Sequence, residues 1–89
     1  MEKIAEKMRE EFEMMRELAS ATRMFLEQHD MLFPRDGGDK RFEDLDSFDY
    51  ALNEIGMHIT RGDISNMEAI YQLGAAHAAF LSKADKWFK

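Results

Sequence analysis

Residues 1–30 read MEKIAEKMREEFEMMRELASATRMFLEQHD and carry the strongest structural signal in the chain. Apolar side chains recur there in steps of three and four residues, which is the spacing of one face of an α-helix. This stripe comprises Ile4, Met8, Phe12, Met15, Ala19, Thr22 and Leu26. A flanking row widens the stripe to the breadth of a core-facing helix and consists of Ala5, Leu18, Ala21 and Phe25. The pattern predicts one long amphipathic helix over about residues 2–30.

A turn-rich segment follows this helix. Residues 34–39 read PRDGGD, and proline, aspartate and paired glycines are typical of turns. Pro34 cannot continue a helix, because its ring removes the amide donor. We therefore expect an acidic loop over residues 31–46.

Two further helices are expected after the loop. Asp46 and Ser47 are favourable N-caps and Gly62 is a typical stop, so a second helix is predicted over about residues 47–60. Ser65 and Glu68 form a capping-box pattern, which predicts a third helix over about residues 64–88.

The three predicted helices make a single all-α domain over residues 1–89, arranged as a long-short-long three-helix bundle. At about 1.5 Å per residue the first helix would be about 40 Å long, and a short middle helix cannot cover two such neighbours. We therefore expect a homodimer in which the first helix, the third helix or both cross their mates. The alternative is a monomeric bundle with a frayed first helix. The expected dimer interface comprises the start of the apolar stripe and a small-sided patch of the third helix: Met8, Phe12, Met15, Gly74, Ala75 and Ala78.

Composition limits the classes of partner. The chain has no cysteine, which excludes disulfides and thiolate zinc sites. Its first residues are charged and no apolar run approaches the ~20 residues of a membrane span, so we expect a cytoplasmic protein without a signal peptide or membrane contact. The net charge is −6, and residues 31–54 hold 3 basic and 7 acidic side chains. Such an acidic middle argues against direct binding of nucleic acid and favours a basic protein partner.

Two pairs of carboxylates point to an enzymatic alternative. Glu10 and Glu13 lie three residues apart, and Glu43 and Asp46 repeat that spacing further along the chain. The arrangement resembles the magnesium-binding pattern of the all-α nucleoside triphosphate pyrophosphohydrolases of the MazG type. The resemblance implies that these four carboxylates hold magnesium against a pyrophosphate.

The histidines and serines give no stronger catalytic signal. Arg23 and His29 resemble the loose Arg-x(4–6)-His spacing of HEPN-type ribonucleases, a spacing that also arises by chance. His58 shares a helix face with Glu54, but two ligands do not make a metal site. We expect His77 to be packed at a helix crossing, and no serine lies in a glycine-flanked elbow. We predict no catalytic residue, no metal site and no cofactor.

The remaining pattern is that of a binding protein. Aromatic side chains alternate with acids from residue 36 to residue 54, and aromatic residues dominate the energetics of interfaces. Acids select a basic partner and raise the association rate. We predict a non-enzymatic protein that occupies a nucleic-acid-handling partner, such as a phage- or plasmid-encoded inhibitor of a host defence machine; a purely structural oligomer subunit is a further alternative. The predicted partner-binding residues are Asp36, Asp39, Phe42, Glu43, Asp44, Asp46, Phe48, Asp49, Tyr50 and Glu54.

Overall fold

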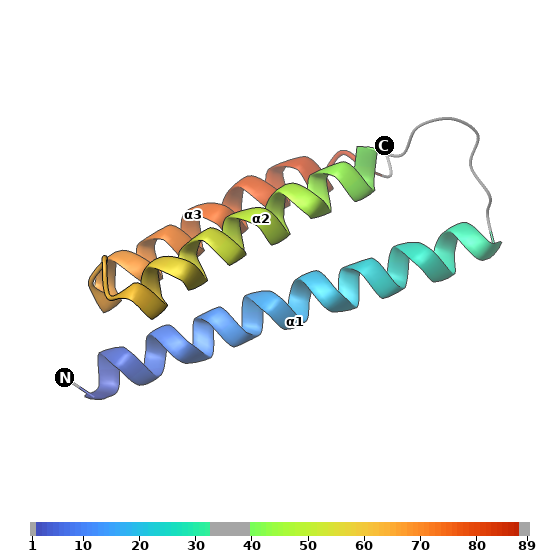
Figure 1. Cartoon of the computed structure of the whole chain (residues 1–89). Helices are drawn as coiled ribbons and strands as arrows, with labels where there is room; N and C mark the ends of the chain where they lie inside the picture. Colours follow the sequence, from blue (N-terminus) through green and yellow to red (C-terminus); the bar gives the residue numbers. More distant parts are fainter. Residues whose placement is uncertain (1, 33–39, 88–89) are drawn as a thin grey trace.

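Three helices packed against one another form the structure (Figure 1). The computed structural model describes residues 2–32 and 40–87, in which α1 spans Glu2–Leu32, α2 spans Lys40–Arg61 and α3 spans Asn66–Ala84. The chain runs up, down and up, so α1 and α3 point the same way and α2 runs against both. The described residues contain helices and turns but no strand. The all-α prediction is therefore confirmed.

The apolar stripe of α1 is buried by the chain's own helices. Met8, Met15, Ala19 and Leu26 are all buried, which confirms the helical face that their spacing predicts. A second copy is not needed to cover this stripe, contrary to the argument from helix length. The reason is that α2 is much longer than its sequence suggested.

The start of α2 is the main correction. The helix begins at Lys40 rather than near residue 47, so residues 40–46 are helical and not part of a loop. Arg41 and Leu45 are buried, and their packing stabilises turns that lack a strong capping signal. Ser47 is not an N-cap; its hydroxyl donates to the carbonyl oxygen of Glu43, one turn earlier, at 3.1 Å. With 22 residues in α2 and 19 in α3, the long-short-long pattern is wrong.

The turn between α2 and α3 follows its sequence signals. Gly62 has a positive φ of 73°, the conformation that glycine adopts at the end of a helix. The Ser65 hydroxyl accepts a hydrogen bond of 3.0 Å from the amide of Glu68, so Ser65 is the N-cap of α3. The helix ends at Ala84, before the predicted residue 88, which lies outside the described residues.

An aromatic stack joins α2 to α3 in the core. The rings of Phe48 and Phe80 lie 4.5 Å apart with 7° between their planes, and Trp87 meets Phe80 edge-on at 5.5 Å. Fully buried leucines from all three helices complete this core: Leu26, Leu45, Leu52 and Leu73. No helix in the described part of the chain has the length and apolarity of a membrane span.

Candidate functional site

The outer face of α2 carries part of the predicted partner-binding set. Glu43, Asp46, Tyr50 and Glu54 follow one another in steps of three and four, so they share one helix face over about 16 Å. Glu43, Asp46 and Tyr50 are exposed, and the Tyr50 side chain is 67% exposed. The structure therefore places a large aromatic side chain in the middle of an acidic row.

Other residues of the predicted set do not lie on this exposed face. Phe48 is only 3% exposed and forms the core stack, so it is not a surface anchor. Phe42 is half-buried and packs against the core. Asp44 accepts a hydrogen bond of 3.0 Å from Nε1 of Trp87, which ties the start of α2 to the end of the chain. Asp36 and Asp39 lie outside the described residues.

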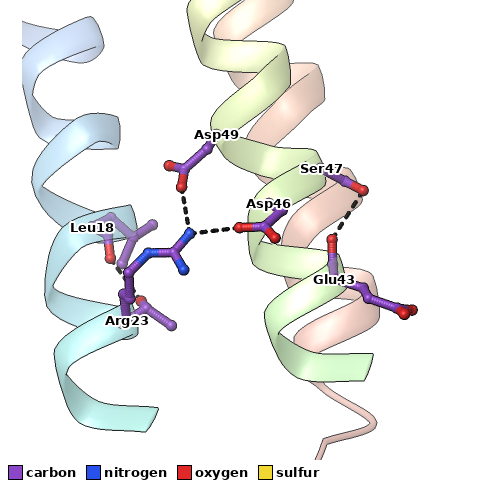
Figure 2. Close-up of polar contacts among 7 residues, drawn as sticks. Leu18, Arg23, Glu43, Asp46, Ser47 and Asp49 are labelled. Carbon is purple, nitrogen blue, oxygen red and sulfur yellow. Dashed lines mark hydrogen bonds and ion pairs between the residues drawn. The ribbon is translucent and has the colours of Figure 1, made fainter. Parts of the chain in front are cut away.

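A charged clasp joins α1 to α2 beside this face. Figure 2 shows Arg23 reaching from α1 between two carboxylates of α2. Its Nη2 donates to Oδ1 of Asp46 at 2.8 Å and to Oδ2 of Asp49 at 2.7 Å. The hydrogen bonds that Arg23 donates to Asp46 and Asp49 raise the pKa of its guanidinium, so it stays charged. The clasp fixes the two acids and neutralises part of their charge.

A solvent-open groove runs between α1 and α2 on the same side as the clasp. One part, of about 350 Å³, is lined by Arg16, Ser20, Arg23 and Asn53 among others. The adjoining part, of about 470 Å³, lies where Phe12 approaches Gly56 and is flanked by further polar residues: Arg16, Asn53, Thr60 and Arg61. The groove is lined mainly by arginine, amide and hydroxyl side chains, and its carboxylate, Asp49, is bound to Arg23.

The carboxylates that resemble a magnesium-binding pattern do not line this groove. Glu10 and Glu13 are exposed on α1, and Asp46 is bound to Arg23. Within the described ranges, no group of three or more histidine, aspartate or glutamate side chains is placed to hold a metal ion. The pyrophosphohydrolase alternative therefore stays a prediction.

The histidines lie apart from one another. His29 faces the ring of Phe25 at 6.0 Å, while Arg23 turns toward α2. Nδ1 of His58 lies 3.2 Å from Oδ2 of Asp63 at the end of α2. His77 stacks on Phe48 at 6.5 Å, in line with its predicted place at a helix crossing.

The outer face of α3 is a feature that the sequence predicted only in part. Gly74, Ala75 and Ala78 are exposed, and nothing lies within 4 Å of a β-carbon built on Gly74. The exposed large residues beside them were not predicted as a surface: Met67, Tyr71 and Leu81. Their steps of four and three with Gly74 and Ala78 are the signal that would have found them. By contrast, Met8 and Met15 of the predicted dimer interface are buried within the chain, and Phe12 packs on its core.

No protein-family model, no curated protein and no solved structure matches this chain.

Proposed function

We propose that this is a non-enzymatic binding protein that occupies a basic protein surface through the outer face of α2. The observation that carries the proposal is the exposure of Tyr50 between Glu43, Asp46 and Glu54 on one rigid helix. Tyrosine is enriched among the residues that dominate binding energy, since its ring buries a large area at a low cost in entropy. The surrounding acids would steer a basic partner and set its orientation.

The surroundings of this face favour binding without reorganisation. The Arg23 clasp holds α2 against α1, and the Trp87–Asp44 hydrogen bond holds its first turns against the end of the chain. A surface that is already ordered loses less entropy on association than a flexible segment. The proposal therefore assigns the partner-binding role to one helix face instead of an acidic loop.

The chemistry of the partner follows from the charge of the face. Lysine- and arginine-rich surfaces are common on proteins that handle nucleic acid, because such surfaces neutralise phosphates. An acidic helix that covers such a surface would block access of nucleic acid to it. In its specific form, the proposal is an inhibitor of a nucleic-acid-handling host defence protein, encoded by a phage or plasmid and acting in the cytoplasm; this form rests on analogy of class.

The proposal includes a homodimer. The stripe of α1 is already covered, which leaves the outer face of α3 as the surface available for a second copy. Pairing through α3 would leave the outer face of α2 free on both copies. A dimer would then present two binding faces and gain avidity for a repeated partner surface.

NMR titration with an oligoarginine peptide tests the binding face. We expect shift changes to centre on residues 43–54, and Tyr50→Ala to weaken binding about tenfold without loss of helix content. The matched control uses the acids of α1: the pair Glu43→Gln and Glu54→Gln is compared with Glu10→Gln and Glu13→Gln. Equal losses from the two pairs would show that only the overall charge matters. An unchanged affinity of Tyr50→Ala would show that the ring does not anchor the partner. Either result would overturn the proposal.

A further inference from the structure

The outer face of α3 is apolar along most of the helix. Met67, Tyr71 and Leu81 are 59%, 72% and 49% exposed, although each is a large hydrophobic side chain. They follow one line with Gly74 and Ala78, in steps of four, three, four and three, which is the seam spacing of paired helices. A contiguous exposed apolar face of this kind marks an interaction site in a folded protein.

The shape of the chain indicates how much surface a partner would cover. The three helices form a rod of 49 × 21 × 16 Å, with a radius of gyration of 14.9 Å against about 12 Å for a compact chain of this length. The accessible surface is 6474 Å², against about 5,400 Å² for a compact monomer of this mass. The elongated chain thus exposes about 1,000 Å² more than a compact monomer of its mass, and each partner in a stable interface buries ~800 Å².

Charge selects a second copy as the occupant. α1 contains five basic and eight acidic residues and α2 contains three and five, whereas α3 contains one of each, Glu68 and Lys83. Two copies with a net charge of −6 repel one another, and α3 is the helix through which they can meet without adding repulsion at the contact. A basic partner or an anionic membrane would need an acidic or a basic face, and α3 presents neither.

We infer that two copies pair through α3 in an antiparallel arrangement, with Gly74 of one copy against Ala78 of the other. This inference rests on the homodimer in the proposed function and specifies its surface and register. About a two-fold axis level with Ala76, the small residues meet at the centre and Tyr71 meets Leu81 on either side. Lys83 lines the pocket between α2 and α3, and Glu68 accepts a hydrogen bond from Gln72, so neither charge lies on the line of Met67, Tyr71 and Leu81 that forms the proposed seam.

The flank of α1 next to α3 completes the interface. The face of α3 alone is about 28 Å long and about 10 Å wide, which is too small for a stable dimer. Met14 precedes the buried Met15, and Arg16 on its other side lines the α1–α2 groove, so Met14 lies on the flank turned toward α3. Phe25, three turns later, shares this flank, and both side chains are more than half exposed. They add two large apolar side chains to the proposed interface beside α3.

Two matched pairs of exposed side chains test the interface. Met67 and Met24 are 59% and 58% exposed, and Tyr71 and Tyr50 are 72% and 67% exposed. We expect a dimer by sedimentation equilibrium, with Met67→Glu and Tyr71→Glu raising its dissociation constant at least tenfold. Met24→Glu and Tyr50→Glu, on other faces, should leave it unchanged, and circular dichroism checks that all four variants are folded. Equal effects within each pair would overturn the inference. So would a wild-type protein that stays monomeric up to the highest concentration at which it is soluble.

Cysteine crosslinking tests the register in a chain that has no cysteine of its own. A mixture of Tyr71→Cys and Leu81→Cys copies should form the mixed disulfide faster than either copy crosslinks with itself, because like positions lie about 15 Å apart in the antiparallel dimer. Faster self-crosslinking would establish a parallel pair and overturn the register. A monomer that still binds oligoarginine through residues 43–54 would refute the dimer alone, while a dimer without such binding would refute the binding proposal alone.

Discussion

Phe12 of α1 packs directly on Gly56 of α2: a β-carbon built on Gly56 would lie 3.0 Å from Cζ of the Phe12 ring. The absence of a side chain at Gly56 is therefore what lets the two helices approach at this point. The same absence at Gly74 serves no contact within the chain, since nothing lies within 4 Å of a β-carbon there. The two helical glycines have different roles.

Alanine substitutions should separate these roles. Gly74→Ala should stabilise the isolated chain by up to about 1 kcal/mol, because alanine is the better helix former. Gly56→Ala should gain much less, since the Phe12 ring must shift, and Gly56→Leu should destabilise the fold by roughly 1–3 kcal/mol through overpacking. Urea unfolding followed by circular dichroism, at a concentration too low for association, measures all three. Equal gains at the two positions would show that Phe12 does not limit the approach.

The sequence predicts α1 well because its amphipathic period runs for 31 residues with a charged face opposite the stripe. It misplaces the start of α2 because Asp46 and Ser47 have the chemistry of caps, while the burial of Arg41 and Leu45, which extends the helix, depends on tertiary contacts.

The candidate surfaces were predictable to different degrees. Phe48 shares a helical spacing with Leu52 and Ile55, and that spacing places it in the core, where the structure has it. Tyr50 falls on the opposite face by the same rule. In α3 the apolar residues surround the whole helix, so periodicity alone cannot say which stripe faces the chain and which faces solvent.

The clasp between Arg23 and the aspartates should contribute modestly to stability. The side chain of Arg23 is 34% exposed and those of Asp46 and Asp49 are more exposed, so solvent screens the attraction. A double-mutant cycle with Arg23→Gln and Asp49→Asn should give a coupling of roughly 0.5–1 kcal/mol in low salt. The coupling should fall as sodium chloride is raised to 1 M, because the charges are near the surface. A coupling independent of salt would mean that the hydrogen bonds, not the charges, hold the helices.

Truncation of Phe48 should destabilise the fold far more than truncation of Tyr50. Phe48→Ala removes one ring of the core stack and should destabilise the fold by about 3–4 kcal/mol. Tyr50→Ala removes an exposed ring and should change the free energy of unfolding by less than about 0.5 kcal/mol. Chemical denaturation of both variants measures the difference. A large loss at Tyr50 would mean that this side chain serves the fold and not a binding face.

The hydrogen bond from Trp87 to Asp44 gives an optical test of how the end of the chain docks. Trp87 is the single tryptophan, and its ring packs edge-on against Phe80. Asp44→Ala should destabilise the chain by about 1 kcal/mol and shift the emission of Trp87 to longer wavelength, because an indole that is no longer held against α2 is more exposed to water. Glu43→Ala, at the exposed neighbouring position, is the matched control and should leave the emission unchanged. A spectrum unaffected by Asp44→Ala would place the indole away from α2 in solution.

The turn between α2 and α3 should depend on Gly62 and Ser65 for different reasons: the backbone conformation at Gly62 and the N-cap hydrogen bond at Ser65. Gly62→Ala forces a side chain into a positive φ of 73° and should cost about 1 kcal/mol, although nothing in the fold touches the added methyl group. Ser65→Ala removes the acceptor of the Glu68 amide and should cost about 1 kcal/mol by leaving the first turn of α3 uncapped. Ser65→Asp restores an acceptor and should recover most of that loss, while Gly62→Asn should recover part of the other, since asparagine tolerates the left-handed conformation. Thermal unfolding of the four variants at one protein concentration distinguishes the two causes: if Asn at position 62 is no better than Ala, the loss there does not arise from backbone strain.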